Sequence, residues 1–128
     1  MYPKDLKYTE SHEWVRVDKD FATVGITDFA TKQLTDLVYV ELPSMGAKVA
    51  KGSSFGVVES VKTVSDLHSP VSGTVVKVNE KLSKEPEIVT QDPYGKGWMI
   101  KVKVENQTEL DTLMHSEEYE ELVRKEKK

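Results

Sequence analysis

Short segments in which apolar and polar residues alternate recur along most of this chain, and turn-forming residues separate them. Alternation with a period of two is typical of strands that bury one face. We expect strands at 12–17, 21–26, 37–42, 54–68 (a hairpin), 73–79 and 98–104. This repetition restricts the chain to a mainly β fold.

Helical signals are confined to two parts of the chain. Thr27 is a candidate N-cap, followed by apolar residues that suit two short turns. Near the C-terminus, residues 108–111 resemble a capping box and Ser116 offers a second N-cap. Residues 80–97 contain the turn signals Pro86, Asp92-Pro93 and Gly95-Lys96-Gly97 and are expected to form a loop.

The length and composition favour one domain. The 128 residues, 38% of them hydrophobic, provide enough apolar surface for one modest core. We therefore expect a single domain over residues 1–128, with a core at about 6–106 and a C-terminal helical segment at about 108–126.

Several classes of function are excluded by composition. The chain has no cysteine, so any sulfur redox chemistry would have to come from an attached group. The formal net charge of -4 argues against nucleic acid or an anionic membrane as the partner. No apolar stretch approaches the roughly 18 residues that span a bilayer, and the first residues lack a signal sequence. We expect a cytoplasmic protein of bacterial type rather than the mature form of a mitochondrial matrix protein.

Lys62 is the only lysine between Ser53 and Val76, and it falls where the hairpin at 54–68 should turn. Gly52 and Gly73 lie ten residues before it and eleven after it. An isolated lysine at an exposed hairpin tip, with glycines almost evenly placed on both sides, indicates a residue presented to another enzyme. Covalent attachment of a cofactor requires that arrangement.

Two neighbours of Lys62 are candidate contacts for such a modifying enzyme. Hairpin tips usually carry Asn-Gly or similar pairs because these turns need positive φ, whereas this tip carries Val61 and the lysine. An exposed valine gains little from burial, so Val61 and the acidic Glu59 are the recognition candidates. The alternative is a surface lysine on an ordinary hairpin, which the spacing alone does not exclude.

A longer set of residues around Lys62 carries a family resemblance. The run Glu-Ser-Val-Lys-Thr-Val-Ser-Asp at 59–66, followed by Ser-Pro-Val-Ser-Gly at 69–73, is similar to the lipoylation site of the glycine cleavage system H protein family. The resemblance extends from about residue 6 to 123. Further matching segments are Ser11–Val15, Val24–Ala30, Val40–Pro43, Asp92–Gly95, Gly97–Trp98 and Glu118–Leu122.

The resemblance implies a fold, a cofactor and partners. The fold would be the flattened barrel-sandwich hybrid of lipoyl and biotinyl carriers, with short flanking helices that include a C-terminal helical segment. Lipoic acid would be joined by an amide to Lys62. The protein would carry the aminomethyl group of glycine from the pyridoxal-phosphate-dependent glycine decarboxylase (P protein) to the tetrahydrofolate-dependent aminomethyltransferase (T protein). Dihydrolipoyl dehydrogenase (L protein) would reoxidise it, a lipoyl-attaching enzyme would modify it, and the chain itself would not be a catalyst.

The resemblance also implies a cleft that receives the loaded arm. In family members a serine and a glutamate before the tryptophan, and an aspartate after the lysine, are associated with this cleft. They match Ser11, Glu13 and Asp66. Each residue also has a plain structural explanation, as a strand cap, a solvated strand residue and a turn acceptor respectively.

Three alternative functions remain open for Lys62. An enzyme that uses the lysine directly would need its amine desolvated in a pocket. Biotin carriers place methionine on both sides of their lysine, whereas Val61 and Thr63 flank this one. A lipoyl relay, which donates lipoyl groups to other proteins, would use the same lysine and is not distinguished by sequence. The three histidines have no metal-ligand spacing.

Overall fold

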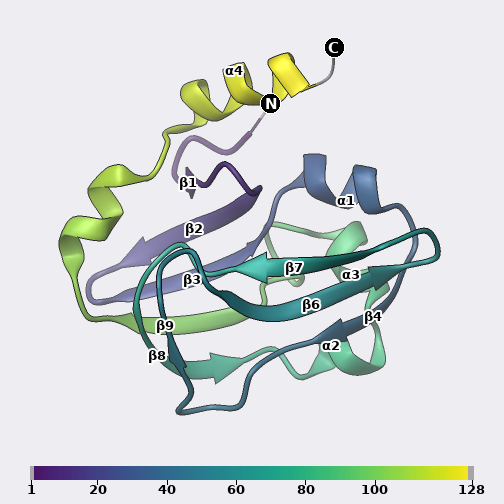
Figure 1. Cartoon of the computed structure of the whole chain (residues 1–128), viewed down its shortest axis with the longest axis horizontal. Helices are drawn as coiled ribbons and strands as arrows, with labels where there is room; N and C mark the ends of the chain where they lie inside the picture. The colour runs from purple at the N-terminus through teal and green to yellow at the C-terminus, as the bar shows by residue number, and fades with distance from the viewer. Residues whose placement is uncertain (1, 127–128) are drawn as a thin grey trace.

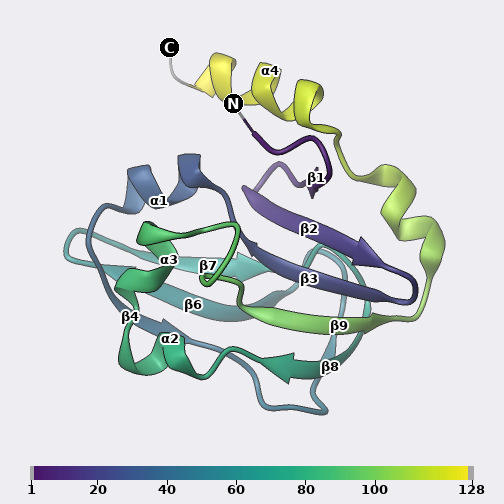
Figure 2. The ribbon, with the colours of Figure 1, turned by 180° about the vertical axis from the view of Figure 1, so that it is seen from behind.

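Two antiparallel sheets packed face to face form the body of the protein in the computed structural model, which describes residues 2–126 (Figures 1 and 2). The larger sheet has the strand order β1-β2-β3-β9-β8-β5 and the smaller sheet the order β4-β6-β7. These elements confirm the predicted mainly β class. The strands are β1 (Lys7–Tyr8), β2 (Glu13–Asp18), β3 (Phe21–Ile26), β4 (Leu37–Glu41), β5 (Lys48–Val49), β6 (Ser54–Ser60), β7 (Val64–His68), β8 (Gly73–Val78) and β9 (Ile100–Val104).

Alternation along β2 divides its buried residues between two hydrophobic clusters. On β2, Val15 faces the main core between the sheets, whereas its neighbour Trp14 faces the opposite side. Trp14 belongs to what we call the second cluster, which covers the outer side of the larger sheet. The buried members of the second cluster are Leu6, Tyr8, Trp14, Phe29, Tyr119 and Val123.

Two helices pack on this second cluster. In α1 (Asp28–Leu34), the Thr27 hydroxyl accepts a hydrogen bond from the Ala30 amide at 3.3 Å, which confirms the predicted N-cap. In α4 (Ser116–Glu126), Tyr119 and Val123 lie four residues apart and bury the same helix face. Figure 1 shows α4 above β1 and β2, and the Tyr119 ring stacks on Tyr8 with centroids 4.7 Å apart.

The predicted loop at 80–97 is wrong in part, because it contains two short helices, α2 (Lys81–Lys84) and α3 (Glu87–Gln91). Each is too short to show helical periodicity in the sequence. Each is instead fixed by one completely buried side chain, Leu82 in α2 and Val89 in α3. Tertiary burial, which local pattern does not reveal, therefore determines these turns.

Three predicted boundaries also need correction. Strand β9 begins at Ile100, because Trp98 is half-buried against the second cluster and does not continue the strand. The segment after it is a 3-10 helix, η1 (Gln107–Thr112), capped by Asn106 rather than by a capping box at 108–111. Ser116 is the first residue of α4, and the Glu118 carboxylate accepts from the His115 amide at 3.0 Å.

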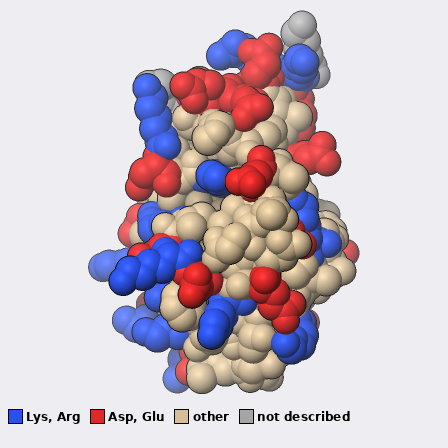
Figure 3. Space-filling model, turned by 90° about the vertical axis from the view of Figure 1, so that its left-hand side faces the viewer, with Lys and Arg blue, Asp and Glu red and all other residues tan. Residues whose placement is uncertain are grey.

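Acidic and basic side chains are interspersed on the end of the molecule away from the Lys62 hairpin (Figure 3). Acidic groups gather near the top of this view, over α4, whose first turn carries Glu117 and Glu118. In the described part of the chain, residues 2–126, no helix combines the length and hydrophobicity needed to cross a bilayer.

Local backbone geometry explains why glycine occupies the two positions on either side of Lys62. Gly52 adopts φ +85°, a conformation that side chains disfavour. Gly73 lies where β8 passes β9 so closely that a Cβ atom would collide with the Lys103 carbonyl oxygen. Their spacing around Lys62 therefore reflects the fold and gives no independent sign of cofactor attachment.

We expect Gly73→Ala to lower the free energy of unfolding by about 1–3 kcal/mol, because the added methyl group forces the paired backbones apart. Urea denaturation measures the effect, with Thr74→Ala on the same strand as the control. Equal losses for the two variants would show that the close approach does not constrain the sheet.

Candidate functional site

A serine hydroxyl stabilises the turn of the hairpin that carries Lys62. The Ser60 amide donates to the Thr63 carbonyl at 2.8 Å and closes the turn. The Ser60 Oγ accepts from the amides of Lys62 at 3.3 Å and Thr63 at 3.1 Å. Among the described residues, positive φ outside glycine is confined to His12, Lys19 and Thr35, so the tip keeps ordinary backbone angles. Serine hydroxyls support turns in this way, and Ser60 is the signal that the sequence prediction missed.

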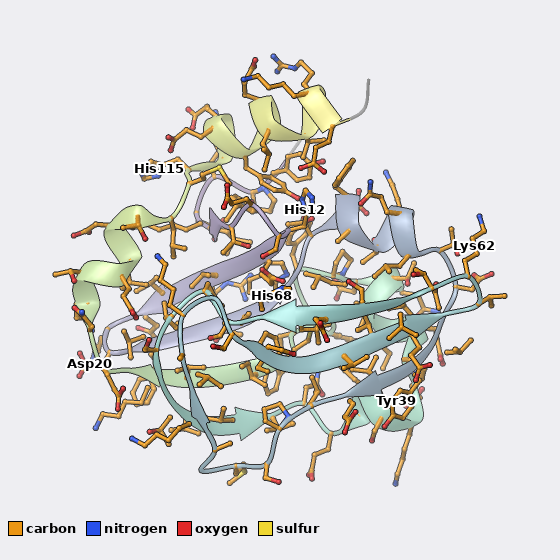
Figure 4. The ribbon with its side chains drawn as sticks, viewed as in Figure 1. His12, Asp20, Tyr39, Lys62, His68 and His115 are labelled. Carbon is orange, nitrogen blue, oxygen red and sulfur yellow. The ribbon has the colours of Figure 1, made fainter. Side chains whose placement is uncertain are left out.

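The Lys62 side chain projects from this tip into solvent (Figure 4). Within residues 2–126 its ammonium makes no hydrogen bond or ion pair. Its neighbour Val61 is 74% exposed, and the Val61 amide donates to the Asp36 carbonyl at 3.3 Å. The tip is thus held against the start of β4 while the amine stays accessible.

A cleft of about 570 Å³ lies near the opposite end of β7. Its walls come from the connection between β1 and β2, the end of β7, the turn before β6 and the end of η1. Its lining includes the polar residues Thr9, Ser11, Glu13, Lys51, His68 and Thr112.

Glu13 is buried in the wall of this cleft, with 1% of its surface exposed. One carboxylate oxygen accepts from the hydroxyls of Thr9 at 2.6 Å and Ser11 at 2.5 Å. The other accepts from the His68 amide at 3.0 Å. Burial raises the pKa of Glu13, and these three donors act in the opposite direction. The carboxylate therefore links the larger sheet to the end of β7.

Asp66 does not line the cleft. Leu67 faces the core, so alternation along β7 places Val64, Asp66 and His68 together on the outer face. At roughly 3.3 Å per residue, Lys62 and His68 are about 20 Å apart along the strand. The structure thus brings Ser11 and Glu13 together and places Asp66 between them and the hairpin tip.

The η1 wall of the cleft was missed by sequence reasoning. The Lys51 ammonium bonds the Thr112 hydroxyl and the Glu109 carbonyl oxygen, the latter at 3.5 Å. The Glu109 carboxylate accepts from the Ser72 amide at 2.7 Å and its hydroxyl at 2.9 Å. These partners are far apart in sequence, and no local signal in the chain joins them.

Comparison with known proteins supports the resemblance. A family model described as glycine cleavage H-protein matches residues 6–126. The chain belongs to the glycine cleavage H-protein family. A glycine cleavage system H protein of Carboxydothermus hydrogenoformans is 56% identical over 124 residues, which are 97% of this chain and 95% of that protein. One of Marinobacter nauticus is 59% identical over 122 residues, 94% of each chain.

A solved structure of the glycine cleavage H-protein family has the same fold. The crystal structure of a glycine cleavage system H protein from Mycobacterium marinum superposes with a TM-score of 0.84 at 40% identity, covering 92% of this chain and 95% of that chain. Membership in this family makes the chain a component of the glycine cleavage system, whose other proteins are its partners.

We expect the stability contribution of Glu13 to decrease as pH rises. Burial raises the folded-state pKa of this carboxyl above its unfolded value, so its contribution is fully present below the unfolded pKa and is lost as pH rises through the folded pKa. Glu13→Gln removes this titration. The unfolding free energy of the wild type minus that of Glu13→Gln should therefore fall as the pH is raised from about 4, near the unfolded-state pKa of a glutamate, through the raised pKa of the folded state.

Urea denaturation across this pH range is the measurement. Glu10→Gln, on the exposed rim of the same cleft, is the matched control. The unfolding free energy of the wild type minus that of Glu10→Gln should change less with pH. A difference for Glu13→Gln that rises with pH would contradict the prediction.

Proposed function

We propose that this protein is the lipoylated carrier of the glycine cleavage system, with lipoic acid attached by an amide to Lys62. The observation that carries the proposal is the exposed Lys62 amine at a hairpin tip, which has no partner among residues 2–126, in a chain of the glycine cleavage H-protein family. When bound, the lipoyl group supplies a reversible disulfide that takes up the aminomethyl group of glycine and is later reoxidised. The donor, acceptor and oxidant would be the P, T and L proteins.

The hairpin suits a carrier because it combines a fixed base with an accessible amine. Ser60 and the Val61–Asp36 backbone contact define the position of the turn. Acylation of Lys62 would remove its positive charge, so the resulting side chain would not be drawn to the nearby carboxylates. Tethering to this base raises the effective concentration of the attached group near a docked enzyme.

The proposed role of the cleft is to receive the amine of the cargo. Ser11, Glu13 and Thr9 present oxygen atoms at its wall, and a buried carboxylate favours a nearby ammonium group. The Lys51 ammonium in the same cleft bonds the Thr112 hydroxyl and, within residues 2–126, makes no ion pair with Glu13. Asp66 lies on the outer face of β7, where it would attract the same charge on the way to the cleft.

In this proposal the chain contributes positioning and protection, while catalysis belongs to its partners. Enclosure of the cargo in the cleft would limit its contact with water, which slows hydrolysis. The named relatives come from prokaryotes, which supports a cytoplasmic location. Neither the Lys62 hairpin nor the cleft requires a nucleic acid or a membrane as a partner.

Attachment is tested by intact mass spectrometry after incubation with a lipoate ligase, lipoic acid and ATP. We expect the wild type to gain one lipoyl increment and Lys62→Arg to gain none, because arginine keeps the charge but offers no acylable amine. Lys77→Arg, at an exposed position on β8, is the matched control and should be modified as the wild type is. Modification of Lys62→Arg would refute the proposal, as would streptavidin capture of the wild type after incubation with a biotin ligase, biotin and ATP.

The role of the cleft is tested with Glu13→Ala. We expect the variant to accept lipoic acid normally but to lose the aminomethyl cargo faster, because the carboxylate that holds the amine is absent. The measurement is the rate of formaldehyde release from the loaded carrier, with Glu10→Ala as the control. Equal lifetimes for wild type and Glu13→Ala would count against the proposed cleft function.

A further inference from the structure

A bulge in β4 turns two consecutive side chains toward solvent. Leu37 is opposite Ser60 on β6, but the next pair joins Tyr39 to Glu59, so one extra residue is inserted in β4. Val38 is 57% exposed and Tyr39 is 44% exposed. A regular strand would direct one of these two residues inward. The bulge therefore adds apolar surface to the outer side of the smaller sheet.

Strand register places this surface beside the lysine. Tyr39, Glu59 and Val64 are directly paired across β4, β6 and β7, and they form the row nearest the hairpin tip. Side chains paired in this way have Cβ atoms about 4.5–5.5 Å apart. The next row along the strands consists of Glu41, Val57 and Asp66.

These two rows and Val38 make up what we call the hairpin face. The rows contain three carboxylates and three apolar or aromatic side chains, arranged alternately. Figure 4 shows Tyr39 and Lys62 at the same end of the molecule. The large hydrophobic side chains exposed in residues 2–126 are concentrated here, since four of six belong to this face or to the tip: Val38, Tyr39, Val61 and Val64, against Val17 and Met45 elsewhere.

We propose that the hairpin face is the docking surface for the enzyme that acylates Lys62, a partner that meets it with apolar side chains framed by basic ones. This inference rests on the proposed lipoylation of Lys62. Several large apolar side chains exposed on one face mark a site of protein association, and such sites combine apolar with charged groups. The carboxylates of Glu41, Glu59 and Asp66 supply the charge that a basic partner surface would complement.

The position of the hairpin face favours this occupant over the other partners. An acylating enzyme must bring its reacting atoms to the Lys62 amine, so its surface has to cover the residues around the tip. An enzyme that acts on the far end of a tethered group has no such requirement. The hairpin face thus reaches beyond the predicted recognition residues, Glu59 and Val61, to β4 and β7, which lie on either side of β6.

The apolar contribution is tested with Tyr39→Thr and Val64→Thr, since threonine keeps β propensity while removing apolar surface. The readout is the initial rate of lipoyl transfer to the unmodified carrier at subsaturating concentration, with purified lipoate ligase, lipoic acid and ATP. We expect Tyr39→Thr to lower kcat/KM by about tenfold, the effect of truncating an anchor residue at an interface. The exposed apolar residues outside the face give the controls Val17→Thr and Met45→Thr, which should stay within about twofold of the wild type.

The charge contribution is tested with Glu41→Lys, compared with Glu117→Lys on α4. Glu41→Lys should slow lipoyl transfer, and raising the salt concentration should reduce this difference because salt screens exposed charges. Thermal unfolding checks that each variant is folded. This charge variant tests the face independently if a threonine variant is unstable.

A reconstituted glycine cleavage reaction with carriers lipoylated to completion identifies the occupant. The variants should then match the wild type, because docking of the acylating enzyme is no longer needed. Normal lipoyl transfer to Tyr39→Thr, Val64→Thr and Glu41→Lys would overturn the inference, as would a defect confined to glycine cleavage, which would assign the face to another partner. Failure of the wild type to gain a lipoyl group at Lys62 would instead refute the proposed function.

Discussion

Contact between the inner faces of the two sheets determines where the other parts of this protein lie. Val15 and Val24 of the larger sheet, with Val58 and Leu67 of the smaller one, are almost completely buried in it. Burial of each such side chain stabilises the fold by about 1.5–3 kcal/mol. A slip of one residue in β7 would expose Leu67, so the register is strongly fixed. That register alone places Asp66 on the outer face and brings the His68 amide to Glu13.

Two features break local rules of stability, and both lie at surfaces to which we assign a function. A buried carboxylate is costly, and three hydrogen bonds only partly offset the desolvation of Glu13. The bulge in β4 likewise exposes Val38 and Tyr39, which a regular strand would partly bury. Departures of this kind are expected where a protein gives up stability for binding. The stability that the packed sheets provide offsets the cost of the buried Glu13 carboxylate and of the β4 bulge.

Prediction from sequence succeeded where a pattern is local and repeated. The alternation in β2 and β3 predicts the hairpin that they form, Thr27 predicts the start of α1, and the strand pattern places Lys62 at the tip that it occupies. Prediction failed for α2 and α3, because one buried residue in a single turn leaves no periodic signal. The spacing of Gly52 and Gly73 was informative about backbone geometry, not about the lysine.

The main strands, the position of Lys62 and, through residue-by-residue resemblance, the family can be predicted from the order of the amino acids. These depend on neighbours within a few positions, where side-chain period and turn chemistry are decisive. The cleft and the hairpin face, in contrast, are formed by residues that meet only in the folded protein. The cleft joins Glu13 to His68 and Lys51 to Thr112, pairs separated by 55 and 61 positions. The hairpin face depends on a register shift between β4 and β6. Such contacts arise when the sheets pack, because packing selects among registers and loop closures that local sequence leaves equally possible.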